Sequence, residues 1–283
     1  MKFHLAMFAA AVGSAALAGA VCPEWTEKEI ETPAPVTHTG KDVRLTVDRV
    51  GSPQAALPVG QHALTEPRIV EKLAQKEKEK SFDAIWLGDS ITHFWEACWE
   101  SDARTFKSKF PQYKILNFGF GGDRTQETLF LLEKSGVLDG VRTPVVNLLI
   151  GTNNLWEDSP EDAALGVRTC VESIRRKLPD VTILLMSILP REVAHVRGGR
   201  DYTKDRPEGV RDHILEKIVR TNGIIRKLAD GKHVIWVDLY PKFLDAEGLP
   251  RLDYFHDGTH PNAAGYTVIA DAILPIYRKI LKK

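Results

Sequence analysis

The stretch AIWLGDSITHFWE, residues 84–96, joins a short apolar run to an amphipathic segment through Gly, Asp and Ser. Similar apolar runs recur along the chain, each bounded by Gly, Pro, Asp or Asn, and together they are Ala84–Leu87, Ile115–Phe118, Val145–Ile150, Val181–Ile188 and Val234–Leu239. Segments of helical length separate them. Continuous apolar runs spaced in this way indicate buried parallel strands joined by crossover helices. The sequence therefore predicts an α/β fold.

Two of the connecting segments carry clear helix signals. Ser159-Pro160-Glu161-Asp162 combines a capping serine, a proline in the first turn and two acids at the positive end of the helix dipole. Apolar residues then recur every three or four positions, which gives this helix one buried stripe. A second such helix is expected from about Asn262 to the end of the chain, and a polar helix is expected over residues 66–80.

Length and composition are those of a soluble globular protein. The 283 residues suit a single α/β domain, and 43% of them are hydrophobic and 27% charged. The formal net charge is zero, so nothing indicates nucleic acid as a partner.

Residues 1–20 have the pattern of a cleaved secretory signal. They combine one Lys, an apolar run and small residues at Ala18-Gly19-Ala20. We therefore expect a secreted or periplasmic protein whose mature chain begins near Val21, without stable membrane insertion. A membrane anchor, or a lipid anchor through Cys22, is the alternative.

The cysteines are Cys22, Cys98 and Cys170. In an exported protein this odd set allows one disulfide with one free thiol, or three free thiols, and both remain open. No CxxC pair is present, so a structural zinc ribbon is not expected.

Polar or glycine-rich segments follow four of the five apolar runs. They are Ser90, Asn117–Asp123, Gly151–Asn154 and Asp257–His260. Because ligands of parallel α/β sheets bind at the carboxyl ends of the strands, we expect these segments to meet at one rim. Taken singly, each has a plainer interpretation: Ser90 as a helix cap, and the others as turns.

The residue types in these segments are those of nucleophilic acyl transfer. Asp257 and His260 can place a carboxylate against one imidazole nitrogen and leave the other nitrogen to act on Ser90. A metal site built from His256, Asp257 and His260 is the alternative, but no further paired ligands are evident. His93, one helical turn beyond Ser90, is interpreted as a helix-surface residue rather than as the base.

Three groups in the same segments can donate hydrogen bonds to an oxyanion. They are the backbone N–H of Ser90, the N–H of Gly122 and the side-chain amide of Asn153. Each such donor is worth about 3–4 kcal/mol of barrier lowering.

In matching order, the four segments resemble the four blocks of the SGNH hydrolase (GDSL-like esterase/lipase) superfamily. The resemblance is strongest to the branch of the platelet-activating factor acetylhydrolase catalytic subunits and their bacterial relatives, and it runs from about residue 80 to the C-terminus. It implies a three-layer α/β/α, flavodoxin-like fold with a five-stranded, mainly parallel sheet. On this basis residues 81–283 are the hydrolase domain, and residues 21–80 are an N-terminal lead and helix.

The resemblance also implies serine ester hydrolysis without a metal or cofactor. Ser90, Asp257 and His260 take the catalytic positions, and Ser90, Gly122 and Asn153 form the oxyanion hole. Asn154 departs from the commonest family sequence, which has Asp there, although the acetylhydrolase branch also accepts Asn.

The function expected is that of an exported serine esterase that removes a short acyl group, acetyl above all, from a carbohydrate or similar polar alcohol. The alternatives are a lipid-directed acetylhydrolase or lysophospholipase, a non-catalytic carbohydrate-binding protein, and a structural cell-surface protein. The oligomeric state stays open.

Candidate substrate-binding residues lie after the third and fourth strands. An aromatic ring there could stack on a sugar and cations could grip an acidic sugar, although packing and a solvated loop at 190–208 are the plainer interpretations. The candidates are Trp156, Arg191, Arg197, Arg200 and Tyr202.

Overall fold

The computed structural model describes residues 54–58, 66–97, 100–191, 196–197, 200–201 and 210–282. The expected signal at 1–20, most of the lead, Cys22, Cys98 and Tyr202 lie outside the described residues, as do the side chains of Arg197 and Arg200.

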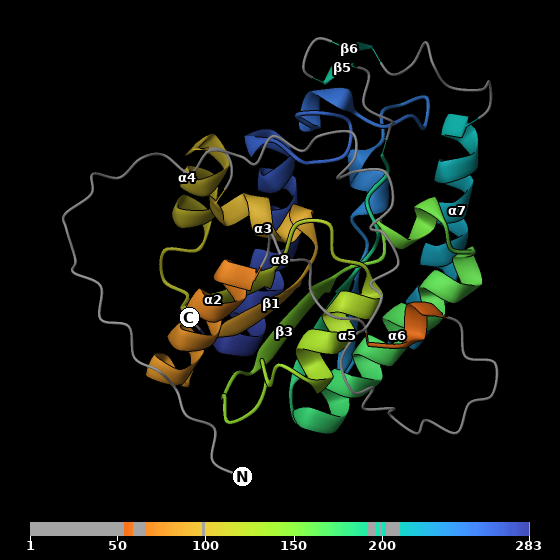
Figure 1. Ribbon diagram of the computed structural model, residues 1–283. Coiled ribbons are helices and arrows are strands. Elements are labelled where there is room, and N and C mark those ends of the chain that lie inside the picture. The colour runs from red at the N-terminus through yellow and green to blue at the C-terminus, as the bar shows by residue number, and fades with distance from the viewer. Residues whose placement is uncertain are drawn as a thin grey trace.

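A five-stranded parallel sheet forms the centre of the fold (Figure 1). Its strands are β1 (Ala84–Gly88), β2 (Ile115–Gly119), β3 (Val145–Leu149), β4 (Thr182–Met186) and β7 (Val234–Val237). Each lies in one of the five apolar runs or overlaps it. The strand order is β2-β1-β3-β4-β7, so β1 pairs with both β2 and β3. The chain therefore adds β2 on one side of β1 and then β3 on its other side. Ligands of flavodoxin-like sheets bind at the switch point that this reversal creates.

Helices cover both faces of the sheet, which gives the expected three layers. The α-helices are α2 (Glu66–Glu79), α3 (Ser90–Ala97), α4 (Glu100–Lys109), α5 (Thr125–Glu133), α6 (Pro160–Lys177), α7 (Val210–Ile225) and α8 (Ala263–Leu281). Short 3-10 turns are η1 (Gln54–Ala56), η3 (Asn154–Trp156), η4 (Arg226–Leu228), η5 (Tyr240–Phe243) and η6 (Leu252–Tyr254).

Alternation along the strands sends successive side chains to opposite layers. Ile85 and Leu87 join the core beneath α5, α6 and α7, whereas Ala84 and Trp86 join the core beneath α3, α4 and α8 (Figure 1). Both faces of the sheet are thus buried, which explains why most residues of its strands are apolar.

The two best-marked helices begin where their caps predict. Ser159 Oγ accepts a hydrogen bond from the Asp162 backbone N–H at 3.1 Å and caps α6. Asn262 Oδ1 accepts from the Ala264 N–H at 2.9 Å and caps α8. Within the described ranges, no helix has the length and apolar character needed to cross a membrane.

The segment at 190–208 contains more structure than the expected loop. Two short strands, β5 (Val196–Arg197) and β6 (Arg200–Asp201), pair antiparallel there. Gly198-Gly199 separates them in the sequence, and this dipeptide is typical of a tight hairpin. The sequence thus contains a signal for a hairpin, but the signal is weak because many of the residues around it are charged.

Candidate active site

Ser90 begins α3 at the carboxyl end of β1, but it does not cap the helix. Asp89 does so instead: its Oδ1 accepts a hydrogen bond from the Ile91 N–H at 2.9 Å, and its carbonyl accepts from the His93 N–H at 3.0 Å. The interpretation of Ser90 as a helix cap is therefore wrong, and its hydroxyl is available for another partner.

Gly88 lets α3 start directly on the end of the strand. A Cβ atom at this position would lie 2.3 Å from Thr92 Oγ1 and 2.4 Å from the Leu149 carbonyl oxygen, closer than real Cβ contacts come. Because only glycine fits here, the first turn of the helix can hold Ser90 at the rim of the sheet.

The structure joins Ser90, His260 and Asp257 through two successive hydrogen-bond contacts. His260 Nε2 lies 2.9 Å from Ser90 Oγ, and His260 Nδ1 lies 2.6 Å from Asp257 Oδ2. The ring of Phe94, which is buried, packs 5.0 Å from the His260 ring between centroids. Segments 170 residues apart in the chain thus meet in hydrogen-bonding geometry.

Asp257 is held as an anion by its own loop. Its Oδ1 accepts backbone hydrogen bonds from Thr259 at 3.0 Å and from His260 at 2.8 Å. Burial opposes the charge, but the hydrogen bonds from the His260 ring and from the backbone N–H groups of His260 and Thr259 outweigh it, so the pKa of Asp257 lies well below its usual range. A carboxylate only accepts hydrogen bonds, so His260 Nδ1 donates and the neutral ring leaves Nε2 to accept the hydroxyl hydrogen of Ser90.

Gly122 lies in a turn that follows β2. The Asp123 N–H donates to the Phe120 carbonyl at 3.3 Å, and Gly122 has φ +82°, the value of the third residue in a type II turn. Glycine adopts this conformation without strain. Gly122 thus lies three residues after the carboxyl end of β2.

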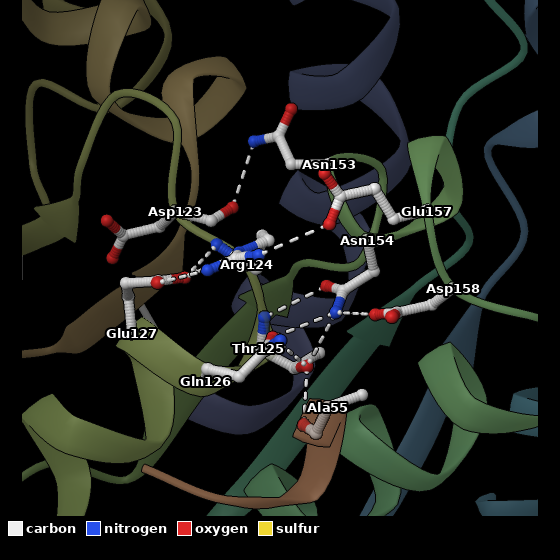
Figure 2. Close-up of polar contacts among 10 residues, drawn as sticks. All are labelled: Ala55, Asp123, Arg124, Thr125, Gln126, Glu127, Asn153, Asn154, Glu157 and Asp158. Carbon is white, nitrogen blue, oxygen red and sulfur yellow. Dashed lines mark hydrogen bonds and ion pairs between the residues drawn. The ribbon is translucent and has the colours of Figure 1, made fainter. Parts of the chain in front are cut away.

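Asn153 ties this turn to the segment after β3. Its Nδ2 donates to the Asp123 carbonyl at 2.9 Å (Figure 2). An amide nitrogen carries two hydrogens, so one remains to donate to a bound oxyanion. The structure thus places all three expected donor residues on neighbouring strand ends, those of β1, β2 and β3.

Comparison with known proteins decides the family. Residues 86–268, more than half of the chain, match the GDSL-like Lipase/Acylhydrolase family. The chain belongs to this family. It is therefore a serine hydrolase that acts on carboxylic ester bonds.

Members of this family are found among both curated and solved relatives. The platelet-activating factor acetylhydrolase IB subunit alpha1 of Bos taurus is 26% identical over 205 residues, which cover 72% of this chain and 78% of the relative. A GDSL-like lipase from Bacteroides thetaiotaomicron has a TM-score of 0.57 at 20% identity, covering 76% of this chain and 97% of that one.

A third relative is an acetylxylan esterase. A catalytic mutant of Axe2 from Geobacillus stearothermophilus superposes with a TM-score of 0.51 at 17% identity, over 70% of this chain and 94% of that one. At such identities, both structural likenesses establish the fold.

Sequence reasoning missed two residues that support the site of this GDSL-like hydrolase. His93 is half-buried, and its Nδ1 accepts the Gly121 N–H at 3.2 Å instead of facing solvent alone. Burial, with the charges of Arg68 and Lys72, lowers the pKa of His93 to about 3, so the ring stays neutral and can accept. Arg68 in turn donates to the Gly119 carbonyl at 3.1 Å.

The candidate substrate residues that the structure describes form a stacked pair. The Arg191 guanidinium, five residues after the end of β4, lies 4.2 Å from the centroid of the ring of Trp156, the last residue of η3. Trp156 is 46% exposed, which agrees with the partly buried packing of the plainer interpretation and leaves part of the ring open to solvent, whereas Arg191 is buried. Arg197 and Arg200 lie on β5 and β6.

The alternative metal set is not assembled. His256 turns Nε2 to Asp102 Oδ2, at 2.9 Å, while both nitrogens of His260 face Asp257 and Ser90. Across the described ranges, no three His, Cys, Asp or Glu side chains gather as metal ligands would.

Cys170, a free thiol in the core beneath α6, has its pKa raised by burial. With Cys170 free, Cys22 and Cys98 are the cysteines left for a disulfide, and both lie outside the described residues.

Asp89→Asn is expected to stabilise the protein more as the pH rises. Asp89 is buried, and its Oδ2 has no hydrogen-bond partner among the described residues. Burial raises its pKa from 3.8 to about 7, so the folded state retains a proton that the unfolded state releases between these values. Stability from the neutral carboxyl is fully present below pH 3.8 and is lost as the pH rises through 7.

Asparagine keeps the acceptor for the Ile91 N–H and never ionises. Its advantage in the free energy of unfolding should be absent near pH 3.8 and reach about 1–4 kcal/mol at pH 8. Urea unfolding of both proteins across this range measures it, with Asp271→Asn, at an exposed carboxylate, as the control. An advantage that does not change with pH would contradict the prediction.

Proposed function

We propose that this hydrolase is an exported acetylesterase that releases acetate from acetylated carbohydrate. The observation that carries the proposal is the hydrogen-bonded set of Ser90, His260 and Asp257, together with the exposed ring of Trp156 three residues after Asn153. The first group of residues supplies ester hydrolysis, and the ring supplies a surface on which a sugar can stack.

The proposed reaction begins with Ser90. As Ser90 Oγ bonds to the acetyl carbonyl carbon, His260 Nε2 takes the hydroxyl proton, and Asp257 stabilises the imidazolium that forms. Negative charge develops on the former carbonyl oxygen. The N–H of Ser90, the N–H of Gly122 and Nδ2 of Asn153 then donate to this oxygen.

Collapse of the tetrahedral intermediate breaks the ester bond. The sugar oxygen leaves with the proton held on His260 Nε2, and the acetyl group stays on Ser90 Oγ. Water then loses a proton to His260 and attacks the acyl-enzyme, which releases acetate and restores the Ser90 hydroxyl. No group outside the chain, the ester and water is needed to balance these steps.

Position and charge favour a polar alcohol. Trp156 comes three residues after Asn153, and the guanidinium of Arg191 lies 4.2 Å from the centroid of its ring. An indole face over a cation suits a sugar ring, including one that carries an acidic group. The names of two relatives, an acetylhydrolase and an acetylxylan esterase, favour acetyl as the acyl group.

Export rests on the sequence of residues 1–20. A charged start, an apolar run and small residues at the expected cleavage point support a secreted or periplasmic location. This location would give the enzyme access to extracellular glycans.

A lipid-directed acetylhydrolase is the second candidate. The similarity to the platelet-activating factor acetylhydrolase subunit favours it. So do Leu249 and Leu252, which are exposed a few residues ahead of the loop that carries Asp257. Both candidates remove acetyl, so they differ in the alcohol that carries it. A test has to compare an acetylated carbohydrate with an acetylated lipid.

A chain-length series followed by two natural-type esters tests the proposal. With p-nitrophenyl esters from acetate to dodecanoate, kcat/KM should be highest for acetate and collapse beyond butyrate, because each methylene that does not fit costs about 1–3 kcal/mol. Acetate release is then compared between acetylated xylo-oligosaccharide and a phospholipid acetylated at its second glycerol carbon.

The oligosaccharide should be preferred by at least about tenfold. Prior treatment with a fluorophosphonate should abolish turnover and add its mass to the peptide that contains Ser90. Preference for the lipid would support the second candidate. Glycan binding without turnover or labelling would instead support the non-catalytic carbohydrate-binding protein.

A further inference from the structure

The side chain of Asn154 is a buried junction of hydrogen bonds (Figure 2). Its Oδ1 accepts the Thr125 N–H at 2.9 Å. Its Nδ2 lies 2.7 Å from Asp158 Oδ2, 2.9 Å from Gln126 Oε1 and 3.1 Å from Thr125 Oγ1. One amide thus joins three side chains and the first N–H of α5.

These contacts connect the two segments that carry the side-chain and backbone donors of the oxyanion hole. Asn154 directly follows Asn153, and Thr125 comes three residues after Gly122. A second connection runs from Asn153 Nδ2 to the Asp123 carbonyl at 2.9 Å. Two neighbouring amides therefore set how far the turn after β2 lies from the segment after β3.

The surroundings of Nδ2 require a donor at position 154. The Thr125 hydroxyl has one hydrogen, and Ala55 takes it with its carbonyl at 2.7 Å, so Thr125 Oγ1 faces Asn154 as an acceptor. Asp158 presents a carboxylate oxygen at 2.7 Å. A carboxylate at position 154 would meet both acceptors without a hydrogen to give, and it would repel Asp158.

We propose that Asn154, matched to the carboxylate of Asp158, is a positioning residue for the oxyanion hole. It holds Gly122 and Asn153 at the separation that lets both donate to one oxygen, and Asp158 is the reason that position 154 requires an amide rather than a carboxylate. The inference rests on the proposed oxyanion hole and deepens it.

Exchanging the two residues tests this pairing. Asn154→Asp places two carboxylates together, which should displace the turn after β2 and lower kcat for p-nitrophenyl acetate about tenfold to a hundredfold. KM should stay within about twofold, because ground-state contacts to the ester are kept. The double variant Asn154→Asp/Asp158→Asn restores one donor and one carboxylate and should recover kcat to within about threefold.

Two further variants separate this effect from a change of charge or of folding. Glu157→Gln removes one carboxylate at the adjacent residue, whose ion pair with Arg124 spans 3.9 Å, and should leave kcat unchanged. Asp158→Asn, the other single variant of the pair, keeps an acceptor for Asn154 and gives the reference kcat with which the double variant is compared. Thermal melting of every variant reports folding.

The inference is overturned if Asn154→Asp keeps the kcat of the parent enzyme. It is also overturned if the double variant does not fold, or if it folds and stays as slow as Asn154→Asp. Absence of fluorophosphonate-sensitive turnover in the parent enzyme would be a different failure, because it removes the proposed function itself.

Discussion

Ser90→Ala is expected to lower kcat for p-nitrophenyl acetate by a factor on the order of 10⁶. Alanine removes the oxygen that would form the acyl-enzyme, and the 2.9 Å contact to His260 Nε2 goes with it. The oxyanion donors remain, so KM should change little and a small rate above that of water should persist. Steady-state kinetics with a highly purified protein measures both parameters.

Ser108→Ala is the matched control for this change. Ser108 lies on α4, where its hydroxyl donates to the Thr105 carbonyl at 3.1 Å in an exposed position. Its replacement should leave kcat unchanged. If Ser90→Ala retained more than about a tenth of the turnover, another nucleophile would have to be sought.

The architecture was readable from the sequence because its signals are local. Strands buried on both faces are mostly apolar, so each run marked a strand that the structure contains. Caps at Ser159 and Asn262 marked the two helix starts for the same reason: a side chain satisfies an N–H only two or three residues away.

The meeting of Ser90, His260 and Asp257 followed from a single rule about strand ends. The contacts that support them did not, because they join segments whose separation has no periodic signal. His93 and Gly121 are 28 residues apart, and Arg68 contacts Gly119 across 51 residues. The amphipathic pattern of residues 84–96 indicated that His93 lies on a helix. It gave no sign that the turn after β2 would contact the His93 side chain.

Asp89 shows a subtler difficulty. Aspartate and serine are both strong capping residues, so Asp89-Ser90 allowed two assignments of the helix start. The helix begins one residue earlier than a serine cap would place it, and this releases the Ser90 hydroxyl. Asn154 was recognised as a departure from the family sequence, whereas its partner Asp158 became visible only in three dimensions.

Asp257→Asn should lower kcat about 10⁴-fold while the fold is kept. The new Oδ1 can still accept the N–H groups of Thr259 and His260, so the loop should retain its shape. The new Nδ2 would point a hydrogen at His260 Nδ1, where Asp257 Oδ2 now accepts at 2.6 Å. His260 would then have to accept at Nδ1 and carry its hydrogen on Nε2, so it could not take the proton of Ser90.

Steady-state kinetics and thermal melting of the variant check both halves of this prediction. Asp253→Asn is the control, since it removes the same charge from the same loop at a carboxylate that is 61% exposed and pairs with Arg251. It should leave kcat unchanged. A folded Asp257→Asn enzyme with more than about a tenth of the parent kcat would show that the tautomer of His260 does not depend on this carboxylate. Slow turnover in Asp257→Asn, with normal turnover in the control, would instead show that the loop after β7 does more than place an imidazole beside Ser90. It would show that the loop also orients this imidazole through Asp257.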